Sequence, residues 1–354
     1  MRTKIKILAC LMISALFVGC LDVLEEPIPA TTLPTELISG SPVITVEADT
    51  VATLSALPLE AGLVGEWKII SDNGNLCRIQ STTSPTSKIY GKFGQDYTLR
   101  WTVKNGEDSV HNDIQVRFLG IYTDPRDNQQ YKLTKIGNQI WMAENFRYAA
   151  NIADTLYYNK DANYGPTYGG LYTLPEALAL APQGWRLPNA ADVALLVKTV
   201  QTQGRNTLVV PSVVGFNGKE ATALKADTAG FAANMKWNPA SAKGINYFGL
   251  NICPAGMSTF TKTDTKTVAT NTTVTTSTFV FSGSQTGAYI WCADLTGDVP
   301  PRQQHLQMTS AAGFTSLTNT VVAPVITNTP STGTPVTIKT VTTTYRRSVR
   351  YLKY

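Results

Sequence analysis

The sequence has few of the residues that usually carry chemistry. Its 354 residues include five cysteines and two histidines, His111 and His305, which lie far apart in the chain. It holds no CxxC pair, HExxH motif, phosphate-binding glycine loop, EF-hand loop or recognisable Ser/His/Asp arrangement. With no zinc-ligand spacing either, we expect a protein without a metal site, a cofactor or catalytic residues.

The N-terminus lacks an apolar run long enough to span a membrane. Arg2, Lys4 and Lys6 precede an apolar stretch at 5–18, and Gly19-Cys20 follows it. This layout is typical of a secretory signal over 1–19. It resembles a bacterial lipobox, in which the Cys20 thiol is diacylated and becomes the first mature residue. The alternative is ordinary signal cleavage, with Cys20 incidental.

The residues after Cys20 suggest where such a lipoprotein would reside. Asp22, Glu25 and Glu26 weakly resemble the acidic export tag of surface lipoproteins of Bacteroidota. Several acyl chains, such as palmitate, hold a protein to a bilayer far better than one. We therefore expect an outer-membrane lipoprotein that is exposed on the cell surface and held there by its lipid anchor.

Charge is sparse as well. Charged residues make up 16% of the chain, and the net charge is +5. Removing the three basic residues of the signal leaves 27 basic and 25 acidic residues, and thus +2. No basic cluster is interleaved with aromatics, so we expect no nucleic-acid partner. About 335 mature residues fit two domains.

The first half after the signal indicates a tether and a β domain. Residues 20–40 are rich in Pro, Thr and acidic residues without periodicity, as in a tether. Residues 41–119 contain short alternating runs separated by turns, which predicts a β-sandwich. In one run Tyr97, Leu99, Trp101 and Val103 share a face. The segment resembles PKD-like, immunoglobulin-type domains, acting either as a ligand-binding module or as a spacer, and we favour the spacer.

The second half, residues 120–354, has a different pattern. It begins with a predicted β-hairpin around Gly137 and continues with predicted helices at 174–181, 189–203 and 220–226. Asn189 is a suitable N-cap for the second helix. Segments at 247–256 and 287–295 and a closing segment at 348–354 are expected to be strands. The chain as a whole is therefore expected to be α+β.

Several short motifs are spread in order over this half, at 122–127, 136–146, 170–172, 175–177, 184–188, 248–256, 288–291 and 348–350. Together they resemble the Fibrobacter succinogenes major paralogous domain, a family of bacterial surface modules. The resemblance implies a C-type-lectin-like α+β fold over 120–354, related in architecture to the formylglycine-generating enzymes. The usual cysteines of the family near the GWRLP motif and after the final Val-Arg are absent.

Cys253 and Cys292 are candidates for a replacement disulfide. If their strands are neighbours, a bridge would close a loop of about 40 residues and contribute about 3–4 kcal/mol. The alternative is two separate buried thiols. Cys77 has no evident partner and is expected to be buried or free.

Two Thr- and Val-rich tracts, 261–281 and 315–345, are insertions relative to the family pattern. Their alternation predicts long strands, with turns at Thr272-Thr273 or within 331–333. Such strands could be exposed edges that pair with another protein by strand addition. Alternatively, they form an elaborated surface loop.

Aromatic residues are the remaining candidates for ligand contact. A tyrosine-rich loop precedes the first predicted helix and could stack on sugars or contact a protein, or could instead pack onto the core. A Trp-Cys-Ala-Asp segment is a distant echo of the sugar-binding strand of C-type lectins. The candidate residues are Tyr157, Tyr158, Tyr164, Tyr168, Trp291 and Asp294.

The sequence thus predicts a surface lipoprotein that acts in adhesion or binds a glycan or protein, without catalysis. One alternative is a structural or tip component of a surface fibre. A second is an oxidase of the formylglycine-generating type, which would depend on reactive cysteines.

Overall fold

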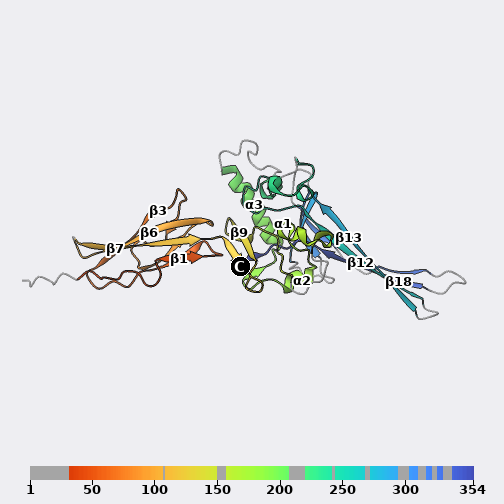
Figure 1. Cartoon of the computed structure of the whole chain (residues 1–354), viewed down its shortest axis with the longest axis horizontal. Helices are drawn as coiled ribbons and strands as arrows, with labels where there is room; N and C mark the ends of the chain where they lie inside the picture. The colour runs from red at the N-terminus through yellow and green to blue at the C-terminus, as the bar shows by residue number, and fades with distance from the viewer. Residues whose placement is uncertain are drawn as a thin grey trace, which may run out of the picture.

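A computed structural model describes most of the chain as a mainly β structure with a few short helices. Figure 1 shows an elongated molecule, with the N-terminal sheets at one end, a helix-bearing head in the middle and a β arm at the other end. Cys20 and Asp294 lie outside the described residues. Within these residues no helix is long and apolar enough to cross a bilayer. The described residues are 32–106, 108–149, 157–206, 220–240, 244–267, 272–293, 303–309, 316–320, 325–329 and 337–354.

The N-terminal part consists of two sheets that enclose one core. A four-stranded sheet has the order β1-β7-β6-β3, and a three-stranded sheet has the order β2-β5-β4. Tyr97, Leu99, Trp101 and Val103 are all buried in this core, which confirms the predicted face of the strand. The strands are β1 (Val43–Val46), β2 (Val51–Ser55), β3 (Val64–Ser71), β4 (Arg78–Ile79), β5 (Thr86–Tyr90), β6 (Gln95–Lys104) and β7 (Ser109–Phe118).

The N-terminal sheets connect to the head through a tight turn and two lysines. Gly120 has φ +66°, and a Cβ there would lie 2.6 Å from Phe93 Cβ, so a side chain does not fit. Lys135 Nζ donates to Thr50 Oγ1 at 2.6 Å, and Lys353 Nζ donates to the Ala48 carbonyl at 2.8 Å. The two parts are thus held together by polar contacts on both sides of the turn.

The head is built on a five-stranded sheet with the order β11-β19-β10-β9-β8. The predicted hairpin is present, since β9 and β10 pair antiparallel and Gly137 turns between them with φ +60°. The closing strand is shorter than predicted. These strands are β8 (Ile121–Thr123), β9 (Gln130–Ile136), β10 (Gln139–Met142), β11 (Trp185–Arg186) and β19 (Leu352–Lys353).

Helices occur in the head at the three predicted places, and a short helix at Gly165–Tyr168 lies in the tyrosine-rich segment where none was predicted. The second predicted helix, observed at Ala190–Asn206, buries Val193, Leu196 and Val200, which share one face at helical spacing. At its start Asn189 Oδ1 accepts a hydrogen bond from the Asp192 amide at 3.0 Å, which confirms the predicted N-cap. The α-helices are α1 (Gly165–Tyr168), α2 (Leu174–Ala179), α3 (Ala190–Asn206) and α4 (Glu220–Leu224); short 3-10 turns are η1 (Tyr158–Lys160), η2 (Ala162–Tyr164), η3 (Thr228–Gly230) and η4 (Ala233–Met235).

The two Thr-rich tracts form strands of one sheet, and this sheet extends into the arm. β13 and β18 flank β12 antiparallel, and β17 pairs with β18, so the arm has the order β13-β12-β18-β17. The prediction of long strands is confirmed. The predicted turn at Thr272-Thr273 is wrong because Thr272 pairs with Thr267 inside the ladder. The strands are β12 (Ala255–Thr267), β13 (Thr272–Ser284), β14 (Gly287–Trp291), β15 (Gln303–Thr309), β16 (Ser316–Thr320), β17 (Val325–Thr329) and β18 (Thr337–Arg346).

Candidate functional site

The segments that distinguish this sequence meet at a buried polar centre in the head. Arg350, from the closing segment, is 1% exposed and donates from Nε to Asn145 Oδ1 at 2.7 Å. Its other nitrogens donate to the carbonyls of Met142, Leu250 and Asn251. Asn145 in turn donates to the Tyr168 carbonyl at 2.7 Å. Four separate segments of the chain are thereby tied together.

This centre is a structural element. Burial lowers the pKa of the Arg350 guanidinium from its usual value. The surrounding carbonyls satisfy its donors, which keeps a buried cation tolerable. Sequence reasoning did not identify this role, although an arginine inside the otherwise apolar Val-Arg-Tyr-Leu segment was a signal for it.

Cys253 borders the same centre and is a free, buried thiol. Its Sγ accepts a hydrogen bond from Asn145 Nδ2 at 3.5 Å and donates to the Thr167 carbonyl at 3.4 Å. Burial raises its pKa, so the thiolate that a nucleophile requires is disfavoured. The geometry around Cys253 therefore fits packing better than redox chemistry.

The expected disulfide between Cys253 and Cys292 is not formed, and both residues are free thiols. Cys253 packs in a cluster with Tyr158 and Tyr168, whereas Cys292 packs in a separate cluster with Ile290. Neither cysteine lies within a strand, because Cys292 directly follows β14 and Cys253 precedes β12. The alternative of two separate buried thiols is the one observed. Burial raises the pKa of Cys292 to about 12.

The tyrosine-rich loop faces inward. Tyr158, Tyr164 and Tyr168 are buried and contact one another, with ring centroids 5.4 Å apart for Tyr158 and Tyr164 and also for Tyr164 and Tyr168. Tyr157 is half-buried and packs against the aromatic cluster of the head. The buried tyrosines pack onto the core, as the alternative interpretation of the loop predicts, and their rings supply the apolar area that holds the loop on the head.

Trp291 also has a packing role. It is fully buried, and its Nε1 donates to the Tyr172 carbonyl at 2.6 Å. The guanidinium of Arg347 lies 4.2 Å from its ring centroid, a cation–π contact inside the protein. Its burial therefore supports packing rather than ligand contact, which stays a prediction.

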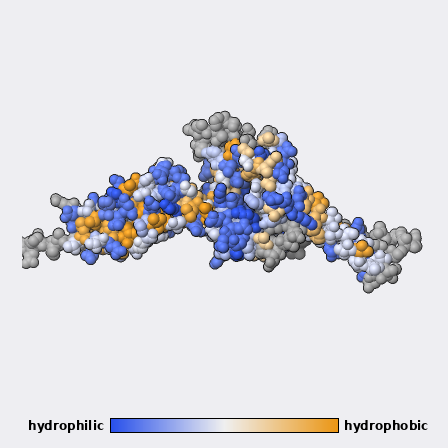
Figure 2. All heavy atoms as spheres, in the orientation of Figure 1, coloured by the Kyte–Doolittle hydropathy of each residue, from blue (hydrophilic) through white to orange (hydrophobic). Residues whose placement is uncertain are grey.

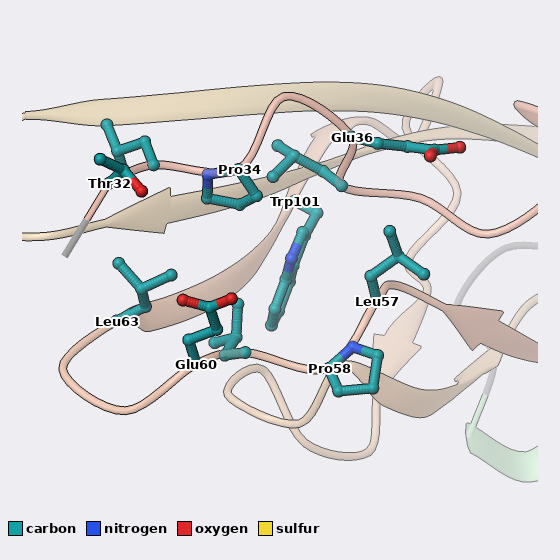
Figure 3. A pocket seen from close by; sticks show the side chains of 11 residues that line it. Thr32, Pro34, Glu36, Leu57, Pro58, Glu60, Leu63 and Trp101 are labelled. Carbon is teal, nitrogen blue, oxygen red and sulfur yellow. The ribbon is translucent and has the colours of Figure 1, made fainter.

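A small cavity of about 170 Å³ opens at the far end of the N-terminal sheets. Figure 3 shows Trp101 standing between Pro34 on one side and Leu57 and Pro58 on the other, with Glu60 nearby. The Trp101 side chain itself is fully buried in the core.

The two carboxylates of the turn before β9 form hydrogen bonds with neighbouring residues of the same turn. Asp124 forms two hydrogen bonds with the Arg126 side chain, at 2.8 and 2.7 Å. Asp127 accepts from the Gln129 amide at 3.0 Å. Within the part of the chain that the structure describes, no group of His, Cys, Asp and Glu residues has the arrangement of a metal site.

The arm is the part of the molecule that projects from the packed core. Its side chains are mostly exposed or half-buried on both faces of the sheet, as the burial patterns of β12 and β13 show. Val274 and Val280 of β13 are 61% and 51% exposed. In Figure 2 the arm is largely pale with orange patches, whereas the head is mainly blue.

The base of the arm is fixed to the head. Phe281 contacts the ring of Tyr158 at a centroid distance of 5.4 Å, and Lys160 Nζ lies 4.6 Å from the ring centroid of Phe279. On the other side Arg346 of β18 forms an ion pair with Glu176 of α2 at 2.9 Å. These contacts make the head a platform that holds the distal strands in a defined direction.

β13 is an edge strand without the usual protection. Among the described residues it pairs only with β12. It runs for 13 residues, and none of them is charged or a proline. Natural proteins generally blunt edge strands with charges, prolines, bulges or short length, because open N–H and C=O groups invite another strand. The exposed edge of β13 is therefore the candidate functional site.

Comparison with known families agrees with the motifs described above. The family model of the Fibrobacter succinogenes major domain matches residues 134–353, which is more than half of the chain. A search of curated proteins and a search of solved structures each found no match. The chain belongs to the Fibrobacter succinogenes major domain family.

Proposed function

We propose that this chain is a non-catalytic surface lipoprotein whose arm binds a protein partner. The observation that carries this proposal is the 13-residue uncharged edge of β13, at the end of the molecule opposite the N-terminal sheets. An extended edge recognises another strand through main-chain hydrogen bonds. Acylation at Cys20 would leave that end farthest from the membrane.

The two folded parts fit complementary roles in this proposal. We infer that the N-terminal sheets are an immunoglobulin-type, PKD-like sandwich that serves as a stalk, and that the head has a C-type-lectin-like architecture. Two sheets around a shared core containing Trp67 and Trp101 support the first inference. Helices packed on a small antiparallel sheet, with both ends of the domain paired near one another, support the second.

Binding of a glycan by the head is less well supported. Tyr158, Tyr164, Tyr168 and Trp291 are buried and Tyr157 is half-buried, so the candidate aromatics offer little open ring surface for stacking on sugars. Oxidase activity is also less well supported, because Cys253 and Cys292 lie in separate clusters and burial raises the pKa of both thiols. A protein partner at the arm accounts for the exposed strand directly.

A second candidate function is that of a structural or tip subunit of a surface fibre. The same edge favours it, since strand addition between subunits can propagate a chain of pairings. In that case the partner would be a fibre subunit rather than a component of another surface.

A photo-crosslinking residue at Thr276 tests the proposal in cells that display the protein. We expect a crosslinked protein adduct from Thr276, and none from the same residue placed at Thr53 on the exposed side of β2. A ladder of regular adducts would indicate the fibre subunit. Absence of any adduct from Thr276, with the protein shown by protease accessibility to be at the surface, would contradict the proposal.

Membrane attachment is tested separately by Cys20→Ser. We expect the wild-type chain in the membrane fraction and the Cys20→Ser chain in the soluble fraction. Equal membrane retention of both chains would contradict the lipid anchor, and the proposed role of the arm would be unaffected.

A further inference from the structure

The edge of β13 is complementary to a second copy of itself. None of its residues is charged, so two such edges would bring no like charges together. Its exposed positions are mainly Thr, Ser and Val, and Thr–Thr and β-branched cross-strand pairs stabilise antiparallel sheets. Charges occur on the neighbouring β12, where Lys262 and Asp264 already form an ion pair with each other at 3.0 Å.

One face of the arm is especially regular. In the β12–β13 ladder Thr276 pairs with Thr263, and Thr278 pairs with Thr261. A strand added beyond β13 would continue this ladder. Because Thr276 and Thr278 are exposed, a neighbouring strand could take its place beside them without displacing any residue that the structure describes.

We propose that β13 pairs antiparallel with β13 of a second copy, which joins two arms into one continuous sheet. This inference rests on the proposed function, in which the arm binds a protein, and it names that protein as another copy of the chain. A two-fold axis relates identical patches that pair with themselves, and antiparallel pairing of one strand with its copy satisfies that symmetry.

The direction of the arm gives this pairing a consequence. The arm extends from the head, away from the N-terminal sheets (Figure 1). Antiparallel pairing reverses the second molecule, so the two N-terminal parts point to opposite ends of the dimer. Such a dimer suits two opposing surfaces, each carrying one copy, and thus self-recognition between cells.

The test uses sedimentation equilibrium of the full chain carrying Cys20→Ser, with paired charge substitutions at the edge. We expect the parent chain to dimerise. With the two-fold axis near Ser277, Thr276 of one copy faces Thr278 of the other, so Thr276→Lys with Thr278→Lys brings like charges together and should raise the Kd by about tenfold or more. Thr276→Glu with Thr278→Glu should do the same. An equimolar mixture of the two variants should recover dimers with a Kd near that of the parent.

The recovery in the mixture separates pairing from misfolding, because a misfolded arm would not be rescued by an opposite charge. A matched control places lysines at Thr53 and Ser55, which are exposed on β2, another edge strand. This control should dimerise like the parent.

Each other outcome overturns the inference. A dimer that is insensitive to the charges at 276 and 278, or that is lost in the β2 control, would place the interface elsewhere. A monomeric parent at every concentration would mean that no second copy occupies the edge. If Thr276 nevertheless forms protein adducts on cells, the proposed function stands and the partner is a different protein.

Discussion

The head buries its strand- and loop-borne apolar side chains, whereas the arm leaves many of its own exposed. In the head, aromatic side chains from an apparently polar loop turn inward, and Tyr168 and Trp291 are almost completely buried. In the arm, a long strand of high β propensity remains open, with Val274 and Val280 exposed. Burial stabilises the first region, whereas the second region gains little from it.

This contrast indicates where function resides in the molecule. A packed centre such as that of Arg350 and Asn145 makes a rigid platform, and its residue identities are set by the geometry of the fold. An edge strand leaves backbone N–H and C=O groups without a neighbouring strand, so its sequence is better explained by a binding partner that pairs with it. The two regions should therefore respond differently to substitution.

The largest effect on stability should come from Arg350→Ala in the head. It leaves Asn145 and several carbonyls without their donor, so the free energy of unfolding should fall by about 3–5 kcal/mol. Urea denaturation monitored by tryptophan fluorescence measures it. Lys132→Ala, at an exposed position of β9, is the control and should change that free energy by less than about 0.5 kcal/mol. A loss for Arg350→Ala as small as in the control would mean that the buried centre does not hold the head together.

Tyr168→Ala should have the next largest effect. Removal of a buried ring should cost about 3 kcal/mol. Val280→Ala, at a half-exposed position of the arm, should cost less than about 1 kcal/mol. Equal losses in the two variants would remove the distinction between the packed head and the open arm.

Alkaline pH should weaken the head through its buried thiol. The folded pKa of Cys292 is raised to about 12 from the model-compound value of 9.0. The unfolded chain therefore loses this proton first, and stability falls between pH 9.0 and about 12. The slope contributed by this one group should be about 1.4 kcal/mol per pH unit. The Cys292→Ala variant should show a shallower decline in the same denaturation series, and an unchanged slope would contradict burial of this thiol.

Gly120→Ala tests the junction between the N-terminal sheets and the head. A positive φ and the close approach to Phe93 should together cost about 1–3 kcal/mol. Limited proteolysis should then cut faster between the two parts. Gly74→Ala shares the positive φ but has no atom nearby, so it separates strain from contact. Equal effects of both substitutions would mean that Phe93 is unimportant.

The smallest effect on stability should come from shortening the arm. Joining Lys262 to Ser277 by an Asn-Gly turn removes the distal part of the β12–β13 hairpin and keeps the paired register. Because both faces of that part are solvated, the unfolding free energy of the head should change by less than about 1 kcal/mol. A large loss would show that the arm stabilises the head.

Local patterns in the sequence predicted the local structure. Alternation identified the buried face of β6, and helical spacing with Asn189 identified α3. The capping box of Thr173 and Glu176 explains why α2 starts where it does. These features depend on neighbours within a few residues, which a single sequence displays.

Contacts between distant segments were not predictable in the same way. The pairing of β12 with β18 brings the two Thr-rich tracts together. Because both tracts have a similar composition, the sequence did not indicate which residues of the two strands pair. The inward direction of the tyrosines and the separation of Cys253 from Cys292 also depend on tertiary packing. The sequence therefore predicted an exposed strand edge, but not that β13 is the outer strand of a sheet formed by both Thr-rich tracts.

Amide hydrogen exchange resolved along the chain tests the central claim most directly. At low concentration the distal amides of β13 should exchange quickly, while β14 in the head remains protected. At high concentration, β13 should gain protection, and the head and the N-terminal sheets should not change. Unchanged exchange in β13, or new protection in either of those other parts instead, would contradict the account of β13 as the strand through which two copies pair.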